Sequence, residues 1–104
     1  MNINEWVAEQ CGVLLDLGNW EYGYQVGDDW EYSDDQWSIH NPRCREIVRE
    51  HFKIWTYYGA IGIDKMGWVS TSSYNNMAQI YGKTIAEAEI ACIRGIYETF
   101  KGDL

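Results

Sequence analysis

Residues 84–100 read TIAEAEIACIRGIYETF, and the other elements of the fold have to be arranged around them. Thr84 and Glu87 have the spacing of a capping box, in which two side chains satisfy backbone N–H groups at a helix start. Apolar residues then recur at helical spacing as far as Phe100, before Lys101 and Gly102 supply the cation and the glycine that commonly end helices. The sequence therefore predicts a helix from Thr84 to about Phe100.

One face of this predicted helix carries small side chains. They are Ala88, Ala91, Cys92 and Gly95. A glycine inside a helix costs about 1 kcal/mol relative to alanine, and close packing would compensate for that cost at Gly95. We therefore expect this face to lie directly against a sheet.

Two further helices are predicted upstream. Asn2 caps a helix over residues 3–14, with Glu5 in the capping-box position. Asn41 caps a second helix that starts at Pro42, because proline is preorganised for the first helical position, and that runs to about Phe52. Its apolar stripe consists of Cys44, Ile47, Val48 and Phe52. Its charged residues are expected to stay solvated, namely Arg43, Arg45, Glu46, Arg49 and Glu50.

Strand signals fill the space between the second and the last helix. Three segments are rich in β-branched and aromatic residues and are separated by glycine-rich or asparagine-rich turns, namely residues 54–61, 67–74 and 77–81. Because consecutive strands joined by short turns pair with each other, these segments predict a three-stranded antiparallel meander.

The segment before the second helix is less regular. Residues 20–26 alternate as a short strand would, and residues 27–29 read as a turn. Residues 30–39 show no clear period and are expected to form a loop with some extended character. The predicted fold class is α+β, with a short antiparallel sheet of three or four strands sandwiched by about three helices. We expect residues 1–104 to form a single α+β domain.

Charge is distributed unevenly along the chain. The net charge is −8, and no Lys or Arg precedes Arg43, whereas nine Asp and Glu residues do. An acidic field repels phosphate backbones and attracts basic surfaces, so direct binding to nucleic acid is not expected. Three widely spaced cysteines, no signal-peptide pattern and no long apolar run favour an intracellular protein in a reducing compartment, without a membrane partner.

No pattern in the sequence indicates catalysis or a metal site. His40, Cys44 and His51 lack the paired spacing of zinc ligands, because the second helix starts after His40. The acids of residues 28–35 lack the central glycine and the final glutamate of a calcium loop. Neither a nucleophile elbow nor a phosphate-binding glycine loop is found. We therefore expect no enzyme activity, no cofactor and no metal.

Acidic and aromatic side chains are interleaved between Trp20 and Trp37. Carboxylates beside exposed rings contact Lys and Arg through both ion pairs and cation–π interactions, so this segment predicts docking onto a basic protein surface. The alternative is a solvated acidic loop whose rings pack inward. The residues predicted to bind the partner are Asp28, Asp29, Trp30, Glu31, Tyr32, Asp34, Asp35 and Trp37.

Three segments of the chain carry a family resemblance. They are Glu5-Trp6-Val7-Ala8-Glu9-Gln10-Cys11-Gly12, Trp37-Ser38-Ile39-His40-Asn41-Pro42, and Thr84-Ile85-Ala86-Glu87-Ala88 with Ile90-Ala91-Cys92-Ile93. Through these segments the chain resembles small bacteriophage proteins grouped as the phage ABA-sandwich domain family. The resemblance covers most of the chain. The resemblance implies a short sheet sandwiched by helices in an accessory protein of a phage or prophage, acting in the host cytoplasm. It transfers no catalytic residue, and residues 18–36 depart most from the family pattern.

These observations together predict a phage-encoded, non-enzymatic inhibitor or modulator. It would dock its acidic aromatic segment onto the basic nucleic-acid-binding surface of a host protein, such as a nuclease or a CRISPR effector. One alternative is a structural phage protein that uses the rings in a homodimer or larger homo-oligomer. The other is a binder of a small molecule such as a nucleotide signal, for which the only basic cluster is Arg43, Arg45, Arg49 and Lys53.

Overall fold

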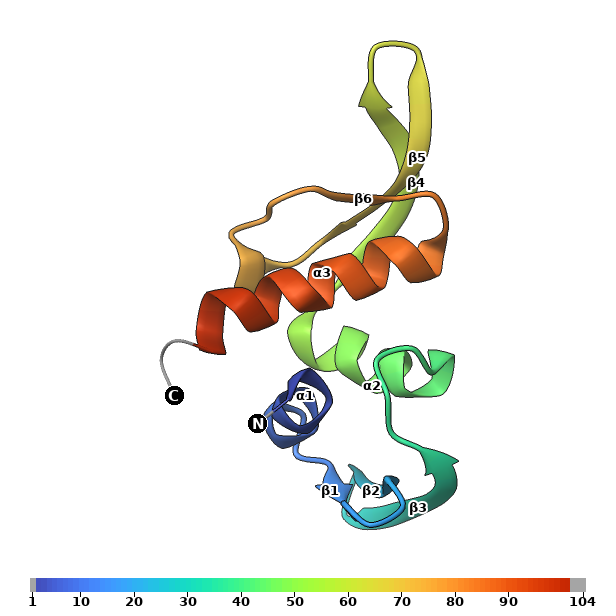
Figure 1. Cartoon of the computed structure of the whole chain (residues 1–104), viewed down its shortest axis with the longest axis vertical. Coiled ribbons are helices and arrows are strands. Elements are labelled where there is room, and N and C mark those ends of the chain that lie inside the picture. The colour runs from blue at the N-terminus through green and yellow to red at the C-terminus, as the bar shows by residue number, and fades with distance from the viewer. Residues whose placement is uncertain (1, 102–104) are drawn as a thin grey trace.

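Three α-helices lie at the middle of the molecule in the computed structural model, which describes residues 2–101 (Figure 1). They are α1 (Ile3–Gln10), α2 (Pro42–Phe52) and α3 (Ile85–Phe100). Strands lie on both sides of the helices, and a short 3-10 helix, η1 (Ser73–Asn75), precedes the last strand. The strands are β1 (Leu14–Leu15), β2 (Glu21–Val26), β3 (Asp29–Gln36), β4 (Trp55–Gly62), β5 (Lys65–Thr71) and β6 (Ile80–Gly82).

The helix starts are capped as the sequence predicts. The side chain of Asn41 accepts a hydrogen bond of 3.0 Å from the N–H of Arg43, and that of Thr84 accepts one of 3.1 Å from the N–H of Glu87. The predicted bounds of α2 and α3 are confirmed. Gly102, expected just beyond the last helix, lies outside the described residues.

The strands form two antiparallel sheets, in the orders β1-β2-β3 and β4-β5-β6. Figure 1 shows the layers along the long axis as the first sheet, then α1 and α2, then α3, then the second sheet. The α+β class is as predicted, whereas the strands do not share one sheet. Each sheet is built from local hairpins, and α2, which connects β3 to β4, lies across the long axis between the two sheets (Figure 1).

Three predicted segments differ from the structure. The first helix ends at Gln10 rather than at residue 14, because Gly12 adopts a φ of +69° and Leu14 then pairs with Gly23. Residues 29–36 form the strand β3 rather than a loop, because pairing with β2 supplies the regularity that the sequence lacks. The segment predicted as a strand over residues 77–81 is shortened to β6, because Asn76 and Met77 both have positive φ.

α3 packs closely against the second sheet, as its small residues predict. A Cβ added at Gly82 in β6 would lie 2.9 Å from the Cα of Ala88, a distance that leaves no room for a side chain. At Gly95 an added Cβ would lie 3.0 Å from Nδ2 of Asn75 in η1. The sheet and η1 therefore use the space that alanine and glycine leave on this helix, although Ala91 is only half-buried.

The core lies among the three helices rather than inside either sheet. The indole of Trp6 stacks on Phe52 with ring centroids 6.0 Å apart and meets Tyr97 edge-on at 5.4 Å. Val48 of α2 and Ile96 of α3 are fully buried beside these rings. Aromatic rings from all three helices, together with aliphatic side chains of α2 and α3, thus form the centre of the core.

A buried carboxylate joins α2, α3 and the second sheet. Glu89 of α3 is only 3% exposed and accepts a hydrogen bond of 3.3 Å from Nε of Arg45 and one of 2.8 Å from Nη1 of Arg49. Thr56 of β4 donates to the same carboxylate over 3.4 Å. Arg45 is itself buried, so the expectation that it stays solvated is wrong. A buried charge needs a partner, and each charge of this cluster has one.

We predict that Glu89→Ala destabilises the fold strongly. The change leaves the buried guanidinium of Arg45 without its counter-charge, and breaking a buried ion pair in this way costs about 3–5 kcal/mol. Urea unfolding followed by circular dichroism measures the free energy of unfolding. Glu98→Ala is the matched control, because Glu98 lies on the exposed face of α3 and its ion pair with Lys101 is at the surface. Equal unfolding midpoints for the two variants would contradict the role of Glu89.

Candidate functional site

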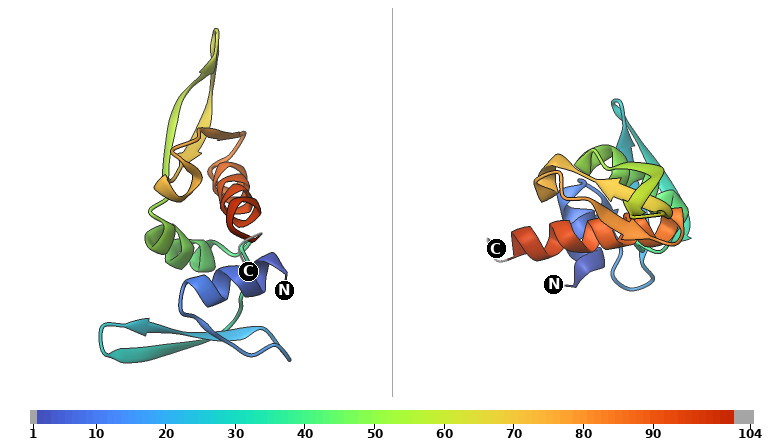
Figure 2. Two further views of the ribbon diagram at one scale, coloured as in Figure 1. Left: turned by 90° about the vertical axis from the view of Figure 1, so that its left-hand side faces the viewer. Right: turned by 90° about the horizontal axis from the view of Figure 1, so that it is seen from above.

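β2 and β3 form one projecting hairpin, here called the acidic hairpin (residues 21–36). Its strands are joined at the pair Val26 and Asp29, with Gly27 in the turn at a φ of +62°. Figure 2 shows the acidic hairpin extending sideways from the helical layers. A hairpin in this position exposes most of its side chains to solvent and to any approaching molecule.

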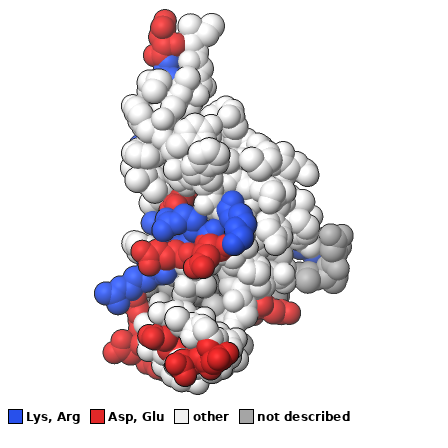
Figure 3. All heavy atoms as spheres, turned by 180° about the vertical axis from the view of Figure 1, so that it is seen from behind, with Lys and Arg blue, Asp and Glu red and all other residues white. Residues whose placement is uncertain are grey.

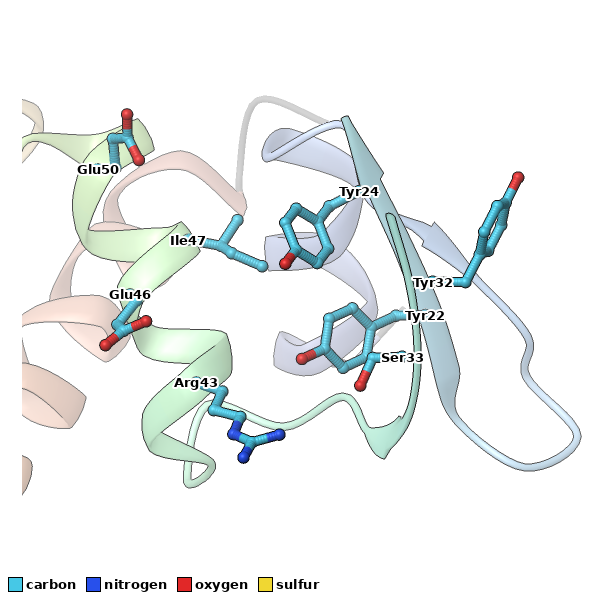
Figure 4. Close-up of a pocket in the computed structure, with 8 residues that line it drawn as sticks. All are labelled: Tyr22, Tyr24, Tyr32, Ser33, Arg43, Glu46, Ile47 and Glu50. Carbon is cyan, nitrogen blue, oxygen red and sulfur yellow. The ribbon is translucent and has the colours of Figure 1, made fainter. Parts of the chain in front are cut away.

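The two faces of the acidic hairpin carry different aromatic side chains. Tyr22 and Tyr24 point toward α2, whereas Tyr32 points to the opposite side (Figure 4). Tyr32 is 75% exposed, and Trp30 is exposed as well. The ring of Tyr32 covers Gly23 on the paired strand, where an added Cβ would approach it to 2.8 Å. Gly23 therefore provides the space on which this exposed phenol rests.

The predicted acidic residues all lie on this hairpin. Asp28, Asp29, Glu31 and Asp34 are exposed, and Asp35 is half-buried where it accepts a hydrogen bond of 3.0 Å from Asn41. Figure 3 shows acidic side chains gathered at the end of the molecule that carries the first sheet. The hairpin thus concentrates carboxylates and two exposed rings on a single element.

Trp37 does not belong to this surface, so its predicted role in partner binding is wrong. It is 2% exposed, and its Nε1 donates a hydrogen bond of 2.8 Å to the backbone oxygen of Asn4. Its ring also meets Tyr22 edge-on at 5.2 Å. The irregular pairing at the base of the hairpin, between Glu21 and Tyr22, turns the chain inward after β3. Trp37 instead anchors the hairpin to α1.

A groove of about 610 Å³ separates the acidic hairpin from α2, here called the tyrosine groove. Its lining residues are Tyr22, Tyr24, Tyr32, Ser33, Arg43, Glu46, Ile47 and Glu50. Figure 4 shows the rings of Tyr22 and Tyr24 directed from the hairpin toward α2, with Arg43 and Glu50 near opposite ends of the helical wall. The groove is therefore aromatic on one wall and charged on the other.

The chemistry of the tyrosine groove favours a cation with an apolar stem. Burial raises the pKa of Tyr22 to about 12, so its phenol stays neutral in this site. Glu46 and Glu50 are exposed carboxylates one helical turn apart on the facing wall. A Lys or Arg side chain fits such a site, since its stem packs on rings and its charged end meets carboxylates.

The tyrosine groove was not predicted from the sequence. The signals were present, because Tyr22 and Tyr24 alternate on one strand face while Glu46 and Glu50 have helical i,i+4 spacing. The sequence did not indicate which face of the hairpin would lie toward α2. That side is set by Arg45, which donates to the backbone oxygens of Ile39 and His40 where β3 connects to α2.

The basic residues of α2 do not form an open anion site. Arg45 is buried against Glu89, and Arg49 donates to the other oxygen of the same carboxylate. Arg43 and Lys53 remain exposed but are separated by three helical turns. The cluster considered for a nucleotide ligand is therefore largely paired within the fold.

No group of three His, Cys, Asp or Glu side chains within residues 2–101 has the arrangement needed to hold a metal ion. The three cysteines are free thiols, and burial raises the pKa of Cys11 to about 12 and that of Cys92 to about 11. Burial also raises the pKa of Cys44. Because the thiolate is the reactive form, these thiols are poor nucleophiles at neutral pH.

Comparison with protein-family models finds no match, and comparison with curated proteins and with solved structures finds no significant one either. The resemblance to the phage ABA-sandwich family thus remains a prediction from the sequence. Among the helices of residues 2–101, none combines the length and the apolar character required to span a bilayer.

We predict that the cysteines react slowly with a disulfide reagent such as Ellman's reagent while the protein is folded. With the pKa of Cys92 at about 11, roughly one thiol in a thousand is ionised at about pH 8. Unfolding in guanidinium chloride should expose all three thiols and accelerate the reaction, as measured by absorbance. Rapid reaction of the native protein would contradict the burial of these side chains.

Proposed function

We propose that this protein is a non-enzymatic binding protein that docks its acidic hairpin onto a basic surface of another protein. The observation that carries the proposal is the concentration of carboxylates and exposed rings on one projecting hairpin beside the tyrosine groove. Carboxylates with neighbouring rings bind Lys and Arg by ion pairing and by cation–π contact.

The acidic hairpin would first act through its electrostatic field. Asp28, Asp29 and Glu31 lie at or next to the hairpin tip, where they are exposed to solvent. An acidic projection steers a basic partner and speeds association, and salt weakens this effect because the Debye length is about 8 Å at physiological ionic strength.

The tyrosine groove would then hold one cationic side chain of the partner. Tyr24 is half-buried, so it offers a ring face while staying fixed in the hairpin. Glu46 and Glu50 on the opposite wall would pair with the guanidinium or ammonium group. Arg43 at the end of the groove limits the site to one cation by repelling a second.

The setting that we propose is the cytoplasm of a phage-infected host. The resemblance to phage accessory proteins and the acidic charge both favour a host protein whose basic surface normally holds nucleic acid, such as a defence nuclease. Occupying that surface would exclude the nucleic acid and inhibit or modulate the host protein. The net charge of −8 makes nucleic acid itself an unfavourable partner.

We predict that neutralising the hairpin tip weakens binding to a basic peptide. The probe is a fluorescein-labelled nona-arginine peptide, and the variant is Asp28→Asn/Asp29→Asn/Glu31→Gln. At about 0.5 kcal/mol for each lost charge interaction, the dissociation constant should rise about tenfold at low salt. Fluorescence anisotropy measures the affinity, and adding salt should narrow the difference between wild type and variant.

The matched control removes three exposed carboxylates elsewhere, as Glu9→Gln/Asp64→Asn/Glu98→Gln. Both triple variants have the same net charge, so only the position of the lost charges differs between them. Equal loss of affinity in the two variants would refute a site on the hairpin. Used as baits in bacterial lysate, the two variants also test the host setting, which requires a host protein that the control retains and the hairpin variant loses.

We further predict that Tyr24→Leu lowers the affinity for the same peptide about threefold. Leucine keeps the apolar packing against the groove but removes the ring, and an exposed cation–π contact contributes about 0.5–1 kcal/mol. Tyr81→Leu, which removes an exposed ring from β6 at the other end of the molecule, should leave the affinity unchanged. If the Tyr24→Leu variant binds the peptide with unchanged affinity, the tyrosine groove is not part of the binding site.

A further inference from the structure

The outer edge of β4 is an unpaired strand edge. Among residues 2–101, β4 pairs with β5 alone, since it is the first strand in the order β4-β5-β6. Successive residues of an antiparallel strand direct their N–H and C=O groups to alternate sides, so about half of the residues of β4 point these groups outward. Within the described chain, none of these outward groups has a backbone partner.

β4 also lacks the features that normally protect such an edge. It reads WTYYGAIG and contains no charged residue and no proline. Natural edge strands are usually protected from pairing by Lys, Pro, bulges or short length. In contrast, β4 has eight residues and a single irregularity in its pairing with β5, near its end. From Ile54 to Gly82 the only charged residues are Asp64 and Lys65, at the turn between β4 and β5.

The hairpin of β4 and β5 (residues 55–71), here called the arm, extends beyond the rest of the fold (Figures 1 and 2). β6 pairs only with residues 68–70, so the outer half of the arm is a two-stranded ribbon. Such ribbons are marginally stable alone in water. Even so, this part exposes apolar side chains, with Ile63 93% exposed and Met66 56% exposed.

The overall dimensions reflect the two hairpins that project from the helical layers. The radius of gyration is 14.5 Å, compared with about 13 Å for a compact domain of this length. The accessible surface is 6551 Å², compared with about 6,000 Å² for a monomer of this mass. A standard interface covers about 800 Å² per partner, or roughly one eighth of this surface.

We propose that the arm is a homodimer interface, in which β4 of one copy pairs antiparallel with β4 of a second copy. An antiparallel pair of identical strands has a two-fold axis perpendicular to the sheet, so the two edges satisfy each other and the assembly closes. The two three-stranded sheets would become one continuous sheet of six strands. Tyr58 and Gly59 are the central residues of β4 and lie at the axis.

The distribution of charge favours a second copy as the occupant. In a chain of net charge −8, self-association requires the acidic surfaces to be kept apart, and the acidic hairpin lies at the opposite end of a molecule 46 Å long. That distance is several Debye lengths at physiological salt, so repulsion between the hairpins is screened. Figure 3 shows the arm uncharged except at its tip.

The other edge of the sheet is protected against continued growth. β6 has only three residues, so a dimer joined through β4 presents short edges on both outer sides. The structure thus favours a closed dimer over a fibre. This arrangement is independent of the acidic hairpin, which remains free in both copies.

The test measures the mass of the protein in solution, for the wild type and for variants that carry a lysine substitution at one edge of the second sheet or the other. Sedimentation equilibrium should show the wild type rising with concentration from the chain mass of 12.1 kDa to twice that value. Tyr58→Lys places two like charges beside the axis and should raise the dimer dissociation constant by about tenfold or more. Tyr81→Lys makes the same change on β6 and should leave the dimer intact.

Circular dichroism and thermal melts establish that both variants fold. If Tyr58→Lys fails to fold, hydrogen exchange on the wild type tests whether β4 lies in the dimer interface. Amides of β4 should gain protection as protein concentration rises, while those of β6 should not. A wild type that stays monomeric at all accessible concentrations overturns the proposal. So does a dimer that survives Tyr58→Lys but is dissociated by Tyr81→Lys.

Discussion

The buried carboxylate of Glu89 is the constraint on which the arrangement of this fold depends. It brings Arg45 and Arg49 of α2 against α3, and Thr56 binds the same group from β4. Arg45 also donates to the backbone where β3 leads into α2. One ionic cluster therefore relates both sheets to the helices between them. Buried ion pairs add little net stability, yet they penalise every packing that separates the charges, and this cluster acts in that way.

With the helical layer fixed, the chain separates its charged and apolar surfaces. The first sheet carries the acidic hairpin, whereas the second sheet and its arm are nearly free of charge. Each hairpin is anchored in the fold by a buried residue, Tyr22 in the first sheet and Val69 in the second, while the rest of the hairpin projects beyond the helices. Both hairpins are thereby exposed to contacts from outside the chain, and they differ in chemistry, one being acidic and the other largely apolar.

The sequence predicted the elements whose signals are local. Caps at Asn41 and Thr84 defined α2 and α3, and the small face of α3 predicted its close packing against a sheet. The sequence could not predict β3, because a strand exposed on both faces shows no alternation and is defined only by its pairing with β2. The burial of Trp37 and Arg45 was missed for a related reason. Each is fixed by a partner distant along the chain, Asn4 for the indole and Glu89 for the guanidinium.

The separation of the two hairpins bears on how binding would work. A dimer joined through the arms would present two acidic hairpins at its far ends, each beside its own tyrosine groove. Two sites on one particle turn the second contact with a repetitive or dimeric partner into an intramolecular event, and avidity then exceeds the affinity of either site by about a hundredfold or more. Weak, salt-sensitive contacts of single carboxylates can thus yield tight binding. In the proposed dimer, an acidic hairpin of modest intrinsic affinity would therefore be sufficient for tight binding.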